Sequence, residues 1–270
     1  MMKSIAIYCV TYNSYKETQL FIESVNTAAG MLKGVEVVVF VADNTEKECQ
    51  IILTDYPNIK VEPYIIGRNL GYFGAVKKCM QKHKPISYDY VIISNVDIVV
   101  NEKALKRLSE LSINDDIGWL APMIFSTSEK RDRNPKILSR YSKRKLQILK
   151  LLYSYPWLNR LYEQTLYRRK SIKSYSHKEG EEIYAGHGSF IILTKTFFSR
   201  IGMIDYPVFL FGEEIYLAEQ CRKYGLKTIY VPSILITDSD HCSTSKMKSS
   251  FYYKCNLESI KYILNEFYNE

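Results

Sequence analysis

The chain has 270 residues, of which 46% are hydrophobic and 24% are charged, and its formal net charge is +8. This composition excludes a chain that is disordered throughout, and the length allows one large domain or two small ones with a buried core. Residues 130–178 carry 15 Lys and Arg against two acids, a balance of +13, whereas the remainder carries 22 basic and 27 acidic residues. A mildly acidic body with one basic segment indicates a local anionic partner and argues against a general nucleic-acid-binding protein.

The sequence is typical of a cytoplasmic protein. No apolar run reaches the roughly 20 residues that cross a bilayer. The start, MMKSIAIYCVTYNS, has a short apolar stretch without a small-residue cleavage site, which is typical of a buried strand and not of a signal peptide. The six Cys form no CxxC pair, which favours reduced thiols and argues against a zinc site.

Strands and helices are expected to alternate along most of the chain. Apolar runs predict strands, in chain order, at 5–12, 35–43, 60–66, 88–97, 118–125, 189–194 and 228–237. Helical patterns lie between and after them, at 16–31, 70–83, 102–112, 195–201, 213–224 and 249–268. This order predicts an α/β fold in which a mostly parallel sheet has helices on both faces.

Residues 126–182 interrupt the alternation. Apolar and aromatic residues recur there at helical spacing on both sides of Pro156, which predicts two short amphipathic helices inserted into one domain that spans 1–270. A basic amphipathic stretch with Trp157 suits the surface of an anionic membrane. The alternative is a solvated excursion that packs its apolar stripe on the body. Nucleic-acid binding lacks a recognisable motif here.

Polar residues follow three of the expected strands, namely Thr11 and Asn13, then Asp43, then Asn95 and Asp97. Ligands of open parallel sheets bind outside the carboxyl ends of the strands, so these residues mark a candidate site. A carboxylate at the second strand could accept hydrogen bonds from a ribose or base, and one at the fourth could hold Mg²⁺ or Mn²⁺. Each acid could instead cap a helix or turn. Convergence of three strand ends favours a site.

Several motifs, taken in order, resemble those of a known family: VTYNS, ADN, NLGYFGAVKK, SNVD, GSFIIL and FLFGEEIYLAEQCRKYGLKTIYVP. The glycines of the third motif are not spaced as G-x-G-x-x-G, which argues against nicotinamide binding. Together the motifs resemble family-two glycosyltransferases with the GT-A fold, especially the bacterial rhamnosyltransferase-like branch, over about 1–125 and 183–245. The resemblance implies inverting transfer of a sugar from a UDP- or dTDP-linked donor to an acceptor hydroxyl.

The resemblance also implies roles for individual residues. The nucleotide-sugar side would comprise Thr11, Asn13, Asp43, Asn69, Gly71 and Asn95. Asp97 and His241 would bind a divalent metal, Mn²⁺ or Mg²⁺. Glu214, preceded by Glu213, occupies the position of the family's catalytic base, and either acid could serve; an acidic helix N-terminus is the alternative. His187 and Gly188 would contact the acceptor or donor sugar, where Gly186 and Gly188 let a sugar approach the backbone.

The expected function is therefore metal-dependent sugar transfer to a glycan or polyprenyl-linked acceptor. The product would belong to a cell-surface polysaccharide, such as lipopolysaccharide or capsule, made at the inner face of the cell membrane. Three alternatives stay open: a nucleotide-sugar-binding protein without turnover, a nucleotidyltransferase, and a binding module built around the basic segment. A nucleotidyltransferase would need a basic triphosphate loop near the first strand, and VTYNSYKET has only one Lys and no Gly.

Overall fold

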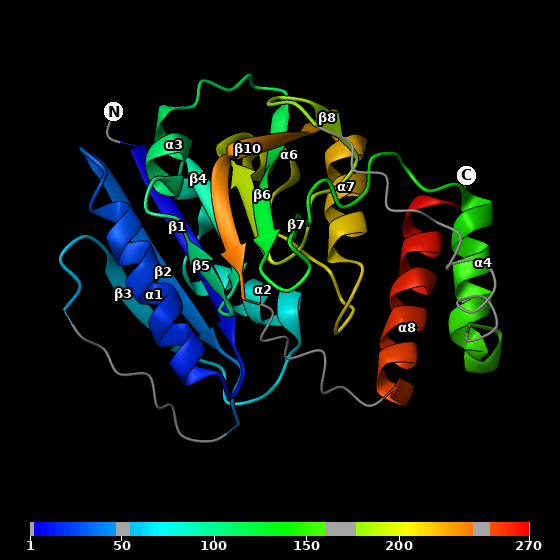
Figure 1. Ribbon diagram of the computed structural model, residues 1–270. Coiled ribbons are helices and arrows are strands. Elements are labelled where there is room, and N and C mark those ends of the chain that lie inside the picture. Colours follow the sequence, from blue (N-terminus) through cyan, green and yellow to red (C-terminus); the bar gives the residue numbers. More distant parts are fainter. Residues whose placement is uncertain (1–2, 47–54, 160–176, 240–248, 270) are drawn as a thin grey trace.

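The protein folds around one large β-sheet with helices on both faces, seen in Figure 1 in a computed structural model that describes residues 3–46, 55–159, 177–239 and 249–269. The strands lie in the order β3-β2-β1-β4-β9-β6-β10-β5. Their bounds in this order are Lys60–Ile65, Val35–Asp43, Lys3–Thr11, Tyr90–Asn95, Phe190–Thr194, Ile117–Ser126, Lys227–Asp238 and Ile98–Val100. Short strands β7 (Arg131–Asp132) and β8 (Glu182–Ile183) pair with β6 and β10.

The sheet has a parallel half and a mixed half. Strands β3, β2, β1 and β4 are parallel to one another, as are β6 and β10. Strand β9 joins these two groups by pairing antiparallel with both β4 and β6, and β5 pairs antiparallel with β10. The predicted α/β fold with a mostly parallel sheet is confirmed, and the antiparallel strands are the detail that the apolar runs did not indicate.

Side chains of successive strand residues point to opposite faces, and each face has its own core. On β1, Ile5, Ile7 and Cys9 belong to the core that α1 (Tyr15–Ala29) and α3 (Ala104–Glu110) cover. Ala6 and Tyr8 belong to the core on the other face. That face is covered by α2 (Tyr72–Lys82), α6 (Lys195–Ile201), α7 (Glu213–Lys223) and α8 (Ser249–Phe267). A short 3₁₀ turn, η1, spans Pro85–Ser87.

The basic segment contributes α4 (Lys143–Ser154), which lies beside α8 in Figure 1. Leu146 of α4 is fully buried, and the Tyr153 ring centroid lies 6.1 Å from that of Tyr252 and 5.9 Å from that of Tyr253. The second helix expected after Pro156 falls largely on residues outside the described part. Of the helices that the structure describes, none is both long and apolar enough to cross a bilayer.

The cysteines within the described ranges are buried and unpaired, namely Cys9, Cys79, Cys221 and Cys255. Burial raises the pKa of Cys79 and of Cys221 to about 12, so both thiols are protonated at neutral pH and act as small apolar side chains. Cys49 and Cys242 lie outside the described residues.

Candidate active site

Three strand ends meet at one edge of the sheet. In the parallel register, Thr11 of β1 lies opposite Asp43 of β2, and Val10 lies opposite Asn95 of β4. The polar residues that follow the apolar parts of these strands are therefore neighbours, at the edge where open sheets of this kind bind ligands.

Two of these residues are buried and hold the surrounding loops. The Asp43 carboxylate accepts hydrogen bonds from the Tyr15 hydroxyl at 3.2 Å and from the Thr45 N–H at 2.9 Å. Thr11 is fully buried, with its Oγ1 2.8 Å from the Thr18 hydroxyl. Both side chains thus shape the floor of the site. Asn13 is different, because it is exposed with a φ of 54°, and its backbone N–H donates to Thr45 Oγ1 at 3.0 Å.

The segment before α2 is held tightly against the strand ends. Asn69 Oδ1 accepts a hydrogen bond from the Gly71 N–H at 3.0 Å, and Asn44 Nδ2 donates to the Gly71 carbonyl at 2.8 Å. Gly71 has a φ of 75°, and a Cβ there would lie 1.9 Å from the carbonyl oxygen of Phe209. Only glycine fits this backbone conformation and this close approach.

Two carboxylates, those of Asp97 and Asp238, lie close together where β4 and β10 end. Asp238 is buried and pairs in register with Ile98, next to Asp97. Burial and the charge of Asp238 raise the pKa of Asp97 to about 6, although the Asn95 side chain hydrogen-bonds Asp97 and works in the opposite direction. Asp238 also binds Arg133, with Nη1 2.5 Å from Oδ2. The same arginine pairs with Glu129, with Nη2 3.2 Å from Oε1, so it is shared among several carboxylates.

The Asp97 carboxylate fits a divalent cation. It is a hard oxygen ligand whose ionised form is disfavoured by burial and by a neighbouring acid, and a cation would offset both effects. Among the described residues, no group of three or more His, Cys, Asp and Glu side chains is placed to hold a metal, and His241 lies outside them. A cation at Asp97 would take further oxygen ligands from phosphate groups and water, as Mg²⁺ commonly does.

Helix α7 begins with two acids in different environments. Glu213 is only 6% exposed, and its Oε1 meets no hydrogen-bond partner in the part of the chain that the structure describes. Burial, followed by the charge of Glu214, raises the pKa of Glu213 to about 8, so the fold favours its protonated form. Glu214 is partly exposed, and its Oε1 accepts a hydrogen bond from the Gly188 N–H at 3.2 Å. Of the two acids, Glu214 is the one that solvent can reach.

Tyr72 lies near Glu213 and Glu214 of α7 and near Asp97. Its hydroxyl donates to the Gly188 carbonyl at 3.0 Å, and Gly188 in turn holds Glu214. Burial raises the pKa of Tyr72 well above its usual range, and the charges of Glu213, Glu214 and Asp97 raise it further. The candidate base and the candidate metal ligand therefore lie around the same aromatic ring.

His187 directly precedes Gly188 and is held in a fixed position. The backbone N–H of His187 donates to Asn134 Oδ1 at 2.7 Å, and the imidazole Nδ1 lies 3.0 Å from Ser189 Oγ. Burial, followed by the positive charge of Lys136, lowers the pKa of His187 to about 3. The imidazole is consequently neutral at physiological pH and can donate or accept a hydrogen bond without carrying charge.

The two glycines that flank His187 have different roles. The expectation that Gly186 lets a sugar approach the backbone is wrong, because a Cβ there would lie 2.8 Å from the Cβ of Ala121 and 2.9 Å from the Trp119 ring. Gly186 is required for packing on the sheet. A Cβ at Gly188 would lie 3.0 Å from Glu214 Oε1, so the space beside Gly188 is the space in front of the candidate base.

This geometry can be compared with known proteins. Residues 6–176 match the model of glycosyl transferase family 2, which covers more than half of the chain. The chain belongs to glycosyl transferase family 2.

Two curated relatives of this family 2 chain are the N-acetylglucosaminyl-diphospho-decaprenol L-rhamnosyltransferases of Mycobacterium tuberculosis strains CDC 1551 / Oshkosh and ATCC 25618 / H37Rv. Each is 24% identical over 263 residues, which are 93% of this chain and 80% of the relative. The predicted resemblance to the rhamnosyltransferase-like branch is thereby confirmed.

Solved structures confirm the GT-A fold. GalNAc-T7, solved with UDP, GalNAc and Mn²⁺, superposes with a TM-score of 0.55 at 14% identity over 90% of this chain. TarS of S. aureus gives 0.54 at 12% identity over 99%. The mannosyltransferase PcManGT from Pyrobaculum calidifontis, solved with GDP-Man and Mn²⁺, gives 0.50 at 13% identity over 87%. The chain spans only 45%, 40% and 56% of these three proteins, and the likeness concerns the fold alone.

Three residues of this family 2 site were not named from the sequence. Asp238 ends its strand as Asp43 does, and this shared position was the available signal. Arg133 and Tyr72 had no comparable signal. Arg133 binds a carboxylate 105 residues away and Tyr72 a carbonyl 116 residues away, so only the fold brings these partners together.

Proposed function

We propose that this family 2 glycosyltransferase transfers a hexosyl or deoxyhexosyl group, with inversion, from a UDP- or dTDP-linked sugar to a polyprenyl-linked glycan. The acceptor class is proposed by analogy with the two relatives, whose names specify a decaprenyl-diphosphate-linked N-acetylglucosamine. The product would enter a cell-surface polysaccharide such as lipopolysaccharide or capsule. The coarser conclusion, sugar transfer by a GT-A enzyme, already follows from the family and the fold.

The observation that carries the proposal is the contrast between the two acids of α7. Glu213 is buried with a pKa of about 8, whereas Glu214 is accessible and held by the Gly188 N–H. A general base must reach the proton that it takes, and only Glu214 meets this requirement. We therefore assign the base to Glu214 and give Glu213 a structural position behind it.

In the proposed reaction, the acceptor hydroxyl gives its proton to Glu214 while its oxygen forms a bond to the anomeric carbon. The bond between that carbon and the diphosphate oxygen of the donor breaks, and attack from the opposite face inverts the centre. Asp97, with His241, would hold Mn²⁺ or Mg²⁺. When bound, such a cation neutralises charge on the departing diphosphate.

The remaining proposed residues serve the donor and the sugar. Asn13 presents its side chain to the nucleotide. Asn69 holds the turn at Gly71, which lies against the nucleotide. His187 and Gly188 face the transferred or accepting sugar. Other members of the donor site hold these contacts in place through buried hydrogen bonds and close packing, namely Thr11, Asp43, Gly71 and Asn95.

The proposal is tested by incubating the full chain with a panel of UDP- and dTDP-linked sugars, a prenyl-diphosphate-linked N-acetylglucosamine as acceptor, and Mn²⁺ or Mg²⁺, and following nucleotide release. We expect turnover with one donor class, and a loss of about 100-fold or more in kcat for Glu214→Gln with unchanged nucleotide binding. Nucleotide binding without turnover would support the binding-protein alternative. Pyrophosphate release from a nucleoside triphosphate and a sugar phosphate would support the nucleotidyltransferase alternative.

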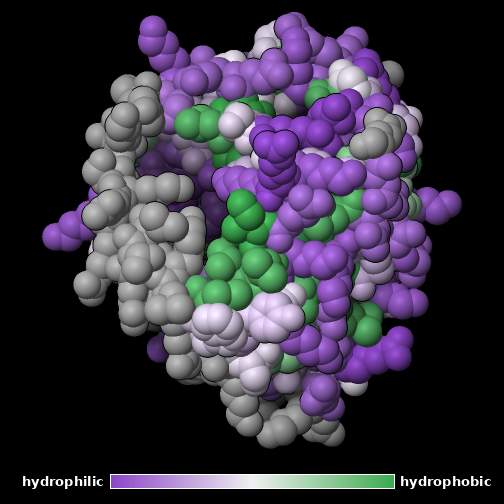
Figure 2. All heavy atoms as spheres, turned by 90° about the vertical axis from the view of Figure 1, so that its right-hand side faces the viewer, coloured by the Kyte–Doolittle hydropathy of each residue, from purple (hydrophilic) through white to green (hydrophobic). Residues whose placement is uncertain are grey.

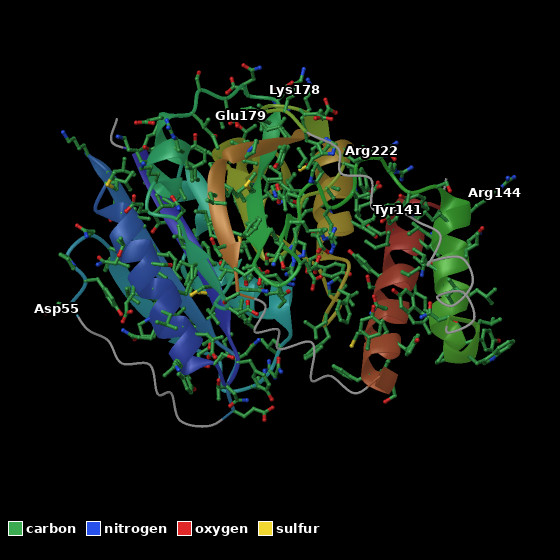
Figure 3. All side chains as sticks on the ribbon, viewed as in Figure 1. Asp55, Tyr141, Arg144, Lys178, Glu179 and Arg222 are labelled. Atoms are coloured by element: carbon green, nitrogen blue, oxygen red, sulfur yellow. The ribbon has the colours of Figure 1, made fainter. Side chains whose placement is uncertain are left out.

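We also propose that the enzyme is cytoplasmic and works at the inner membrane face, with residues 130–178 against anionic lipid. Helix α4 presents Ile148 and Leu151, which are 55% and 51% exposed, and Trp157 follows it at 61%. Arg144 extends outward from the same helix in Figure 3. The side of the molecule that holds α4 and α8 faces the viewer in Figure 2, where hydrophobic and hydrophilic areas adjoin. Basic residues around exposed apolar side chains suit an anionic bilayer surface.

A further inference from the structure

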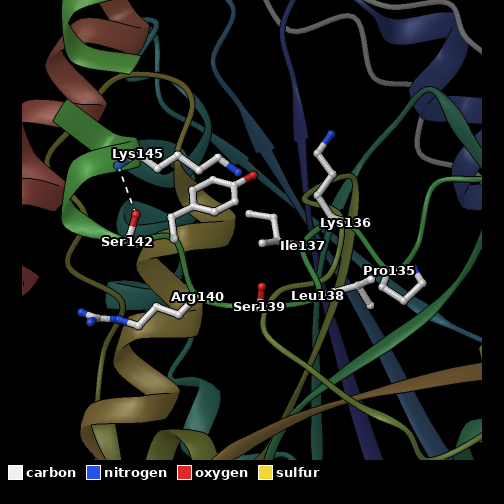
Figure 4. Close-up of a pocket in the computed structure, with 9 residues that line it drawn as sticks. Pro135, Lys136, Ile137, Leu138, Ser139, Arg140, Ser142 and Lys145 are labelled. Carbon is white, nitrogen blue, oxygen red and sulfur yellow. Dashed lines mark hydrogen bonds between the residues drawn. The ribbon is translucent and has the colours of Figure 1, made fainter. Parts of the chain in front are cut away.

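A basic hollow lies where the chain runs from the active site toward α4. It has a volume of about 500 Å³ and is lined by residues 135–142 and Lys145. Figure 4 shows the amino ends of Lys136 and Lys145 on the same side of this segment, while Arg140 points away from them. The described lining includes three cations and no acid.

The three cations of this basic hollow differ in the contacts that they make within the protein. Arg140 is engaged, with Nε 2.6 Å from Glu219 Oε1 and Nη2 3.0 Å from the Phe267 carbonyl. Lys145 lies over the Tyr141 ring, with Nζ 3.4 Å from the centroid. Lys136 is exposed, and in the described part of the chain no carboxylate forms an ion pair with it. Two ammonium groups over a space of this size suit a ligand with several anionic oxygens.

The hollow is structurally continuous with the candidate active site. Its Ile137 forms a β-bridge with Ala185, and the preceding Asn134 accepts the N–H of His187 at 2.7 Å. The charge of Lys136 reaches His187 as well, since it contributes to the lowered pKa of the imidazole. The residue after His187 is Gly188, which holds the base Glu214.

The other end of the hollow leads to the exposed apolar face of α4. Lys145 lies in the first turn of α4, and Ile148 follows three residues later, so the two side chains are neighbours on the helix surface. Leu151 continues that exposed face by a further turn. Base, hollow and apolar face thus follow one another in the order in which a lipid-linked acceptor presents its sugar, its phosphates and its hydrocarbon.

From this arrangement we infer that the basic hollow binds the diphosphate of a prenyl-diphosphate-linked acceptor, with Lys136 and Lys145 as its cationic ligands. The inference rests on the proposed function for the identity of the acceptor. The diphosphate of the donor is the other possible source of the same chemistry, but its proposed place is at the strand ends beside Asp97. The hollow lies instead along residues 135–142 and Lys145, between Asn134, which contacts His187, and helix α4.

Binding of farnesyl diphosphate to the full chain, measured by isothermal titration calorimetry, tests the inference without requiring turnover. We expect Lys136→Gln/Lys145→Gln to weaken binding by about tenfold or more, because two charge-assisted contacts to phosphate are lost. The matched control is Lys33→Gln/Lys103→Gln, which removes the same charge from exposed lysines elsewhere and should change the affinity by less than about threefold. Farnesol, which lacks the diphosphate, should not distinguish the variants.

Equal losses in the two double variants, or unchanged affinity in Lys136→Gln/Lys145→Gln, would overturn the inference. Displacement of farnesyl diphosphate by UDP or dTDP would also overturn it and assign the hollow to the donor. Failure of the proposed function looks different: no donor is turned over, yet farnesyl diphosphate binding still depends on Lys136 and Lys145. If transfer is observed, the same double variant should raise the acceptor KM and leave the donor KM unchanged.

Discussion

Glu213 and Glu214 show how two neighbouring positions on one helix acquire different chemistry. Position 213 points into the protein, where burial opposes ionisation, and position 214 meets the Gly188 N–H at the edge of the sheet. Folding favours the protonated form of Glu213, whereas the accessible Glu214 carboxylate is the one that we propose for proton transfer. This separation of environments is a common way for adjacent carboxyl groups to take different roles.

The protonated state of Glu213 predicts a pH-dependent stability. Its pKa is raised from 4.5 to about 8 on folding, so between these values the folded chain keeps a proton that the unfolded chain releases. Stability should therefore fall as pH rises through this interval. Glu213→Gln removes the ionisation, and its Tm relative to the native chain should rise between pH 5 and pH 8 by on the order of a few degrees. A Tm difference that is the same at both pH values would show that Glu213 is ionised in the fold.

At the scale of elements, the segment that leads into α2 depends on one glycine. Gly71→Ala would place a methyl group against the Phe209 carbonyl in a backbone conformation that L residues rarely adopt. We expect a loss of about 2 kcal/mol or more in the free energy of unfolding, measured by urea denaturation. Gly67→Ala is the matched control, because Gly67 has a φ of 71° with open space around its Cβ position. Equal losses in the two variants would contradict the close approach to Phe209.

Helix α4 carries the prediction about the membrane. Ile148→Gln/Leu151→Gln should reduce binding to vesicles that contain phosphatidylglycerol by about tenfold or more, since each side chain would otherwise bury apolar surface in the lipid. Co-sedimentation with vesicles measures the effect. Leu20→Gln on α1 is the control, because Leu20 is equally exposed at 52% and lies outside the basic segment. Vesicle binding that is unchanged in the double variant would leave α4 as a helix that only packs against α8.

At the scale of the whole molecule, the ion pair between Arg140 and Glu219 joins the basic segment to the body, as the pair between Arg133 and Asp238 also does. Glu219 of α7 is 1% exposed and accepts hydrogen bonds from Arg140, from the Tyr184 hydroxyl at 2.6 Å and from the Tyr268 hydroxyl at 3.2 Å. The Arg140 guanidinium also lies 4.0 Å from the centroid of the Tyr268 ring. These contacts tie the segment before α4 to α7 and to the end of α8.

Breaking this pair should destabilise the protein strongly. Arg140→Met leaves the Glu219 charge buried without its main cation, and we expect a loss of about 3 kcal/mol in the free energy of unfolding by urea. Adding Glu219→Gln should recover part of the loss, because the remaining buried group is then neutral. Additive losses in the double variant would mean that the two side chains do not interact in solution.

The sequence predicted those site residues that have a local signal, and it did not predict contacts between residues that are far apart along the chain. The strand-end residues Asp43, Asn95 and Asp97 were found because an apolar run stops at each, which is a local signal. The position of the proposed base could be predicted only as Glu213 or Glu214, because local sequence does not say which side chain is buried. The positive charge of the basic hollow was visible in the sequence, but its place beside the candidate active site was not, since that depends on contacts with residues 185–187.

The division of the chain into one domain with an insertion at 126–182 and a final helix at 249–268 stays an interpretation. Within it, α4 and α8 are packed together although about 100 residues separate them, and α8 spans Ser249–Phe267. Helices α4 and α8 lie on the side of the molecule that we propose faces the membrane.

The sequence by itself determined the α/β alternation, the strand-end polar residues and the location of the positive charge, because apolar periodicity, strand termination and composition are properties of short stretches. Only the tertiary structure decided which acid of α7 is accessible, that Asp238 and Arg133 flank Asp97, and that Lys136 stands next to the His187 side of the active site. Burial, and the electrostatic effects that follow from it, depend on partners that are remote in sequence and meet only when the sheet has formed.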